Sequence, residues 1–397
     1  MSDTRRLFRT LAIATFFLYL GFNVWRAVFN NFAVEEIGVT ATQIGVIQAI
    51  REVPGLLGFT LGFLALVFSE MRIMGISVLV LGVGLVVSGM SDIVSVLILG
   101  TLLMSIGFHW FYPSNSSLVL MGMSKDEAPK TLGRLRSISA FSAVIGTIVV
   151  WIFIDGIDFG PINIPSWGYR TTLIVVGVVV ILGSLITLGD KIQKGAQRER
   201  RKIIFRRQYW LYYALTFLMG SRRHIFTTFA IFMLVQIHGI SVRETATLFL
   251  INNLLNTYAG AQLGKLVARF GERKVLTFNF LGLVGVFLGY AFVPYLPVLF
   301  ALFVLDNIFF GFNLAIESYF QKIALSPDEI TSNVSMAQTI NHVSALIVPI
   351  LGGILWEQIA PSATFRAGVL IAVVSLVLVQ FIRTDTVPAT PVPVGAD

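Results

Sequence analysis

The chain has 397 residues, of which 56% are hydrophobic and only 13% are charged, and it contains no cysteine. Its mean hydropathy of +0.82 lies far above that of soluble globular domains and indicates a protein that crosses a membrane several times. The missing cysteines exclude disulfides and thiolate metal sites.

Apolar runs of about 20 residues are long enough to cross the ~30 Å hydrocarbon layer of a membrane. Reading for such runs between charged or turn residues predicts twelve spans. The first run lacks a small-residue cleavage site and is too long for a signal peptide, so we predict that it is a transmembrane helix. The spans cover residues 7–34, 41–66, 72–90, 93–121, 132–154, 168–189, 208–236, 242–267, 275–293, 296–323, 332–356 and 363–382.

The positive charges are distributed unequally between the two predicted membrane sides. Of the 29 Lys and Arg residues, 22 fall on one side, 3 on the other and 4 inside spans. The positive-inside rule therefore places both termini in the cytoplasm. The net charge of +8 reflects this topology and predicts no nucleic-acid partner. We expect a multi-pass protein of the cell (inner) membrane that is surrounded by the lipid bilayer and acts as a monomer.

One long hydrophilic connection divides the chain. Residues 190–207 hold eight Lys and Arg and are interpreted as a cytoplasmic linker at anionic lipid headgroups. The linker separates an N-terminal half, residues 1–189, from a C-terminal half, residues 208–383. The tail, residues 384–397, contains Pro and Thr and is expected to be disordered.

The two halves repeat each other in sequence. RAVFNNFA opens at Arg26 and RHIFTTFA opens at Arg223, which places an arginine at the head of each copy. A repeat of six helices per half is typical of secondary transporters that rock two bundles around a midplane site. The further matches, at offsets that stay between 197 and 204 residues, are 61–73 with 263–275, 107–109 with 311–313, 124–127 with 326–329 and 142–145 with 344–347.

The whole chain resembles the major facilitator superfamily, which carries a loop motif G-x-L-A-D-R-x-G-R-K between the second and third helices of each half. The resemblance implies an all-α membrane fold of two pseudo-symmetric six-helix bundles, and a loop that latches one conformation. The second copy of the motif keeps Gly264, Leu266, Arg269, Gly271, Arg273 and Lys274, with Ala268 at the acid position. The first copy keeps Gly62, Leu64, Ala65 and Arg72, with Leu66 at the acid position and Ser69 at the second glycine.

The repeated arginines are the first candidates for a binding site. An arginine near the bilayer centre costs roughly 2.5–3.5 kcal/mol on insertion scales. Arg26 shares a helix face with Asn30, and Arg223 shares the equivalent face with Thr227. Because a guanidinium is a planar fork that suits carboxylate, sulfonate or phosphate oxygens, these four residues predict a site for an anionic substrate group. The alternative is that a protein acid neutralises each arginine. Arg222, which points elsewhere, is expected to pair with an acid or to snorkel.

Acids inside the membrane are the candidates for proton coupling. Asp306, Asn313 and Glu317 are spaced to share one face of the tenth span. Burial disfavours the charged form of an acid unless a cation is near, so Glu317 or Asp306 is expected to exchange a proton or to form a fixed ion pair. Asn313 is expected to contact the substrate.

Arg51 and Glu52 are neighbours in sequence and are therefore expected to face different directions. Glu52 is expected to balance an arginine of the cavity or to carry a proton. His109 and His342 are interpreted as substrate-binding residues, because a histidine can hydrogen-bond an oxyanion. The alternative reading of both histidines is a hydrogen bond between helices.

These features predict a secondary active transporter that moves a small organic anion by alternating access, with proton coupling as one option. The sequence contains no phosphate-binding G-x-x-x-x-G-K-[ST] loop, which indicates a solute gradient rather than ATP as the energy source. No HExxH or GxSxG motif occurs, so we expect neither an enzyme nor a metal or cofactor site. The alternative is proton-coupled efflux of hydrophobic compounds, although residues 139–153 lack the proline of the motif typical of efflux members.

Overall fold

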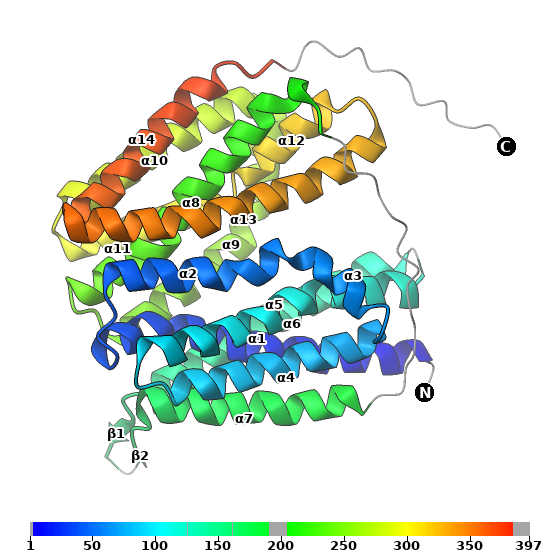
Figure 1. The fold of residues 1–397 in the computed structure, drawn as a ribbon, viewed down its shortest axis with the longest axis vertical. Helices are drawn as coiled ribbons and strands as arrows, with labels where there is room; N and C mark the ends of the chain where they lie inside the picture. Colours follow the sequence, from blue (N-terminus) through cyan, green and yellow to red (C-terminus); the bar gives the residue numbers. More distant parts are fainter. Residues whose placement is uncertain (1–2, 125, 161, 190–204, 384–397) are drawn as a thin grey trace.

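The computed structural model describes residues 3–124, 126–160, 162–189 and 205–383 (Figure 1). Its regular structure is helical apart from one short β-hairpin. The N-terminal half contains α1 (Asp3–Glu35), α2 (Ala41–Leu56), η1 (Gly58–Thr60), α3 (Leu61–Leu64), α4 (Glu70–Gly89), α5 (Val94–Gly122), α6 (Glu127–Phe153), β1 (Ile157–Phe159), β2 (Ile162–Ile164) and α7 (Gly168–Leu188). The C-terminal half contains η2 (Arg207–Tyr209), α8 (Trp210–Gln236), α9 (Val242–Phe270), α10 (Glu272–Phe292), α11 (Leu296–Phe310), α12 (Asn313–Ile323), α13 (Pro327–Gln358) and α14 (Pro361–Val379).

The predicted all-α fold is confirmed, since helix occurs at every segment that was predicted to span the membrane. Within the described part of the chain, nine helices are long and apolar enough to cross a membrane, judged by length and composition. The other three expected spans correspond to α2, α8 and α9, and α2 has only 16 residues. The count of twelve spans and the cytoplasmic position of the termini stay predictions.

The second predicted span is interrupted, so a continuous helix does not occur there, and the tenth has one irregular turn. In the second, α2 contains Pro54 and ends at Leu56, and the chain continues through η1 and α3. In the tenth, Gly311 and Phe312 separate α11 from α12, although both keep right-handed helical backbone angles and Leu296–Ile323 counts as one of the nine apolar helices. Asp306 therefore stands on α11 and Glu317 on α12, on either side of this irregular turn.

Two helices that the repeat relates begin with the same local structure. Thr40 caps α2, and its hydroxyl accepts from the backbone N–H of Gln43 while the Gln43 side chain accepts from the Thr40 N–H at 3.0 Å. Ser241 caps α9 in the same way, with Glu244 accepting from the Ser241 N–H at 2.8 Å. Each reciprocal pair satisfies two backbone donors that the first helical turn leaves free. The sequence repeat thus fixes equivalent helix starts in the two halves.

Helices of the same half pack together, as Figure 1 shows. In the N-terminal half α4 packs between α5 and α7, and in the C-terminal half α10 packs along α14. The phenylalanines of the repeated segment lie in the core of each half: Phe29 and Phe32 on α1, and Phe226 and Phe229 on α8, are all at most 2% exposed. Most of the predicted linker, 190–204, and the predicted tail, 384–397, lie outside the described residues, and the domain boundaries stay a prediction.

The two halves meet at one end of the molecule, which we call the closed end. There Thr42 of α2 donates its backbone N–H and its hydroxyl to the carboxylate of Glu357 on α13, at 2.9 and 2.7 Å. Nearby, the Asn31 amide donates to the carbonyl oxygen of Ile240 at 2.8 Å. These bonds join residues that are more than 200 positions apart and hold the halves together at this end.

Glycines allow α2 and α13 to cross closely at the closed end. A Cβ on Gly45 would stand 2.2 Å from the carbonyl oxygen of Pro349, and one on Gly353 would stand 2.5 Å from that of Ala41. Both distances are too short for any side chain, so the backbones are in direct contact only because these positions are glycine. Small residues at helix contacts of this kind are typical of membrane proteins.

Candidate functional site

The two repeated arginines are each stacked on a phenyl ring. The Arg26 Cζ lies 4.1 Å from the ring centroid of Phe249, which belongs to α9 of the opposite half. The Arg223 Cζ lies 4.1 Å from the ring centroid of Phe310, at the end of α11. A guanidinium that rests its face on a ring keeps the N–H groups at its edge available for a planar oxyanion.

The four arginines inside the predicted spans differ in whether an acid lies within ion-pair distance. Arg222 Nη1 donates to Asp306 Oδ1 at 2.9 Å, and both side chains are buried, which confirms the predicted ion pair of Arg222. The side chains whose charges act on Arg26 are Arg51 and Arg223, which are both cations. Among the residues that the structure describes, neither Arg26 nor Arg223 forms an ion pair with an acid. The two repeated arginines thus have no carboxylate at ion-pair distance among the described residues, although the charges of Glu52 and Asp306 reach Arg223.

Arg51 and Glu52 do not face different directions, and that prediction was wrong. Arg51 Nη2 donates to Glu52 Oε1 at 2.8 Å, and both side chains are largely buried. The pairing is possible because an arginine side chain is long enough to curve around its own helix toward the next residue. This ion pair accounts for one oxygen of the carboxylate and leaves Oε2 for other contacts.

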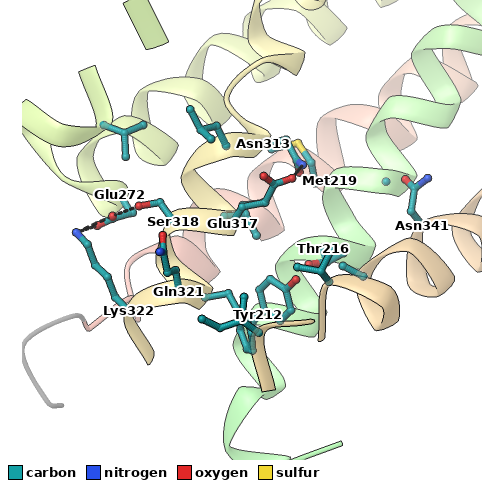
Figure 2. A pocket seen from close by; sticks show the side chains of 18 of the residues that line it. Tyr212, Thr216, Met219, Glu272, Asn313, Glu317, Ser318, Gln321, Lys322 and Asn341 are labelled. Atoms are coloured by element: carbon teal, nitrogen blue, oxygen red, sulfur yellow. Dashed lines mark hydrogen bonds and ion pairs between the residues drawn. The ribbon is translucent and has the colours of Figure 1, made fainter. Parts of the chain in front are cut away.

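A cavity of about 740 Å³ lies beside Arg223 in the C-terminal half. Glu317 and Asn313 of α12 form part of its wall, together with Asn341 of α13 (Figure 2). The Asn313 amide donates to Glu317 Oε1 at 3.0 Å. Within the described part of the chain Glu317 has no cation at ion-pair distance, whereas Asp306 is paired with Arg222. The structure therefore brings Arg223, Asn313 and Glu317 to one cavity, and neither Asp306 nor Arg26 belongs to its wall.

The two predicted histidines lie together, but at a different place. His342 Nδ1 of α13 is 3.1 Å from Glu52 Oε2 of α2, so this contact joins the two halves. The ring centroids of His109 and His342 are 5.5 Å apart. His109 Nδ1 lies 2.9 Å from the carbonyl oxygen of Ser105, one helical turn earlier on α5. We call Glu52, His109 and His342 the interhelical cluster.

Asn30 and Thr227, which were predicted beside the arginines, have different surroundings. Asn30 is buried, and its Oδ1 has no hydrogen-bond partner among the described residues. Thr227 is exposed, and its hydroxyl donates to the carbonyl oxygen of Arg223 at 3.0 Å. A buried acceptor without a donor is costly, but an amide oxygen cannot bind an oxyanion, so this observation does not support the predicted contact with an anion. The binding roles of both residues stay predictions.

The second copy of the loop motif connects α9 to α10. Gly271, between these helices, has a φ of +79°, which is the region that favours glycine. Arg273 donates to the side-chain oxygen of Gln380 at 3.3 Å, and the Arg269 guanidinium lies 5.2 Å from the ring centroid of Phe270. Gly264 borders the cavity. The latch that the family resemblance implied stays a prediction.

The first copy of the motif is built differently. Gly62 belongs to the short helix α3, and the backbone N–H of Arg72 donates to the Ser69 hydroxyl that caps α4. Ser69 stands where the motif has its second glycine, and it starts a helix because a serine side chain accepts from the first-turn N–H groups.

Glu272 supplies an acid close to the position where the motif lacks one. It is 2% exposed and accepts from Lys322 Nζ at 2.7 Å and from the Ser318 hydroxyl at 2.7 Å. These bonds tie the start of α10 to α12, as Figure 2 shows. The contact lies within the C-terminal half and fixes the helix that carries Glu317.

The two aromatic rings that contact the arginines were not predicted from the sequence. Phe249 and Phe310 are two of 33 phenylalanines in a chain whose helices are all rich in apolar residues. Tyr212 and Thr216 of α8, which also line the cavity, were missed as well. They precede Arg223 by two to three turns on α8 and share its helical face, so helical spacing from Arg223 was the signal that could have found them.

The chain belongs to the Major Facilitator Superfamily, because the model of that family matches residues 11–324 and 263–397. It is therefore a multi-pass membrane transporter that binds a small-molecule substrate, and it is not an enzyme. No curated protein matches the chain in sequence.

Solved structures of this superfamily share the fold. A point mutant of the nucleoside transporter NupG has 14% sequence identity and a TM-score of 0.76, with 94% of this chain and 99% of that chain covered. A bacterial homologue of the human lysosomal transporter Spinster, in an inward-facing and occupied conformation, has 13% identity and a TM-score of 0.74, with 95% and 96% covered. At these identities the likeness shows the fold alone.

Proposed function

We propose that the chain is a secondary active transporter that moves a small organic anion by alternating access, with Arg26 and Arg223 as the residues that bind the anionic group. The observation that carries the proposal is the contrast among its arginines. Arg222 and Arg51 each have a carboxylate, and the two repeated arginines have none among the described residues. Unpaired charges in a membrane interior are costly, and an anionic substrate supplies the missing partner.

The positions of the two arginines suit a transport cycle. Arg26 belongs to the N-terminal half and Arg223 to the C-terminal half, and the charge of Arg223 reaches Arg26. An anion between them reduces this repulsion and draws the halves together. Because each guanidinium presents a planar fork of donors, the proposal favours a carboxylate, sulfonate or phosphate group.

Glu317 is the residue that we assign to proton coupling. Its carboxylate faces the same cavity as Arg223 and is held by the Asn313 amide rather than by a cation. An acid in this setting can accept and release a proton as the cavity opens to either side. Asp306 is paired with Arg222 and serves as a structural partner of that arginine.

The closed end defines the conformation of this structure. Under the predicted topology, the closed end lies on the outer side of the membrane and the cavity on the cytoplasmic side. We therefore assign an inward-facing conformation. The Spinster homologue that was solved in an inward-facing conformation has a similar fold, and this supports the assignment.

The experiment is a thermal-shift screen of the purified full chain. Organic carboxylates, sulfonates and phosphate esters form one arm, and hydrophobic cationic dyes form the other. A ligand that binds the folded state raises the melting temperature, by an amount that grows with the ratio of its concentration to its Kd. We expect the anions to raise it and the dyes to leave it unchanged. Stabilisation by the dyes alone would instead support the efflux of hydrophobic compounds.

A further inference from the structure

The interhelical cluster brings three potential metal ligands into contact from three helices. Glu52 on α2, His109 on α5 and His342 on α13 each offer one ligand atom, and these atoms lie within 4.8 Å of one another. The residues are spread over almost 300 positions of sequence, which is why no metal site was expected from motifs. All three are at least partly buried.

One distance within the cluster is close to that between two ligands of one ion. Zinc binds nitrogen at about 2.0–2.1 Å and carboxylate oxygen at about 2.0–2.2 Å in a tetrahedral arrangement, which separates neighbouring ligand atoms by roughly 3.3–3.5 Å. His342 Nδ1 and Glu52 Oε2 are 3.1 Å apart. The three ligand atoms lie within 4.8 Å of one another, so the side chains have to close by about 1 Å to surround one ion.

Contacts behind the cluster orient its ligand atoms. His109 places Nδ1 2.9 Å from the Ser105 carbonyl oxygen, so this nitrogen carries the proton and Nε2 presents its lone pair. A metal-binding histidine typically donates its other ring N–H to a carbonyl or carboxylate in this way. Arg51 holds Oε1 of Glu52, which directs Oε2 toward His342.

Gly55 provides the space in front of the two rings. The point where its Cβ would stand is 2.7 Å from His109 Nε2 and 2.7 Å from His342 Nδ1, and only 2.2 Å from a ring carbon of His342. The two nitrogens thus converge on one small volume beside α2. Any side chain larger than hydrogen would occupy this volume and displace the His342 ring.

We propose that Glu52, His109 and His342 form a binding site for a divalent transition-metal ion of the zinc class. Two imidazoles and one carboxylate are a ligand set that suits zinc and its neighbours, whereas Mg²⁺ and Ca²⁺ prefer oxygen ligands. Because α2 and α5 belong to one half and α13 to the other, the bound ion ties the halves together. The bound ion therefore stabilises the conformation of this structure, in which the closed end is closed, and slows transport.

The test is a calorimetric titration of ZnCl₂ into the purified full chain, from which any affinity tag has been removed. Saturable binding of one Zn²⁺ per chain, with a rise in the melting temperature, is the expected result. MgCl₂ in the same titration is expected to give neither. Absence of saturable Zn²⁺ binding to the wild-type chain would overturn the proposal.

Variants locate the site. His109→Gln and His342→Gln each remove one ligand, and Gly55→Ala fills the space while keeping all three ligands. Each is expected to weaken Zn²⁺ binding at least about tenfold, the size of effect typical of perturbed metal sites. Their melting curves without zinc show that each variant is folded.

Matched controls change the same residue types outside the cluster. His238→Gln removes a histidine beyond the end of α8, and Gly58→Ala adds a Cβ that meets no atom within 4 Å. Both are expected to bind Zn²⁺ like the wild type. Equal loss of binding in His238→Gln, or unchanged binding in both His109→Gln and Gly55→Ala, would show that the ion binds elsewhere and contradict the proposal.

Discussion

Arg222 donates to Asp306 at 2.9 Å inside the C-terminal half, and this pair leaves the next residue, Arg223, without an acid of its own. Both partners are buried, with side-chain exposures of 0% and 6%. Two adjacent arginines on one helix thus have different roles, because successive side chains point about 100° apart. One arginine is part of the protein framework and the other faces the cavity.

The ion pair of Arg222 and Asp306 predicts how single and double variants change the free energy of unfolding. Arg222→Met leaves the Asp306 carboxylate buried without a cation, and we expect a loss of about 3–5 kcal/mol in the free energy of unfolding. The double variant Arg222→Met/Asp306→Leu removes both charges and is expected to recover most of that loss. Melting curves of the purified variants provide the measurement. A double variant that is less stable than Arg222→Met would contradict the assignment.

The coupling role of Glu317 predicts a separation of binding from accumulation. Glu317→Gln keeps the shape and the Asn313 contact but cannot release a proton. We expect pH-driven accumulation of the anion identified by the screen to fall at least about tenfold, with exchange of that anion retained. Uptake into proteoliposomes, with and without a pH gradient, measures both. Glu127→Gln, at the start of α6, is the control, and pH-driven accumulation retained by Glu317→Gln would return the assignment to Asp306 or Glu52.

The crossing of α2 and α13 predicts that a side chain at Gly45 opens the closed end. Gly45→Val places atoms where the Pro349 carbonyl oxygen lies, since even a Cβ would be 2.2 Å from it. We expect the population to shift away from this conformation by about 1 kcal/mol or more, which is a factor of about five. Because the chain has no cysteine, Thr216→Cys in the cavity wall serves as the only reporter for maleimide labelling.

The labelling rate of Thr216→Cys from the side on which the cavity opens should fall in the Gly45→Val background. The control is Gly285→Val, because a Cβ at Gly285 in α10 meets no atom within 4 Å. Equal labelling in the two backgrounds would show that the close crossing does not govern the conformation.

Glu329, at the start of α13 and before the membrane span, gives a prediction about pH. Burial alone would raise the pKa of its carboxyl, but hydrogen bonds from the Tyr209 hydroxyl and the Arg206 guanidinium outweigh this and lower the pKa. A lowered pKa in the folded state means that the stabilisation is present above about pH 4.3, the unfolded value, and is lost as pH falls through the folded pKa.

Glu329→Gln is therefore expected to melt at a lower temperature than the wild type at neutral pH. The difference between the two should shrink as the pH falls below about 4. Melting curves between pH 3 and pH 8 measure it. A difference that is independent of pH would show that the charge of Glu329 does not contribute.

The helical segments were predicted well because each one is a long apolar run that can be identified from neighbouring residues alone. Runs of about 20 apolar residues and the doubled arginine segment need no tertiary information. The break in the second span and the irregular turn in the tenth were not predicted, although Pro54 and Gly311 lie at or near them. Both residue types are tolerated inside membrane helices, so their presence alone does not show where a helix ends.

The site was predicted less completely because its contacts depend on how distant helices pack. The arginines were identified by the cost of their burial, and the pair of Arg222 with an acid was anticipated. The stacking of Arg26 on Phe249 joins residues of opposite halves, so the spacing of residues within one helix cannot predict it. The pairing of Arg51 with Glu52 was missed because helical spacing gives the direction of each Cβ atom, whereas a long arginine side chain can place its guanidinium elsewhere.

The most direct test of the account is the affinity of the anion for variants of the two repeated arginines. Lysine keeps the charge but replaces the planar fork with a compact ammonium, so Arg223→Lys and Arg26→Lys should each weaken binding about tenfold or more while the protein still folds. Arg366→Lys, in a loop-proximal position of α14, should bind as the wild type does. Calorimetric affinities for all four proteins decide the matter. Unchanged binding in both Arg26→Lys and Arg223→Lys would contradict the claim that these arginines hold the substrate.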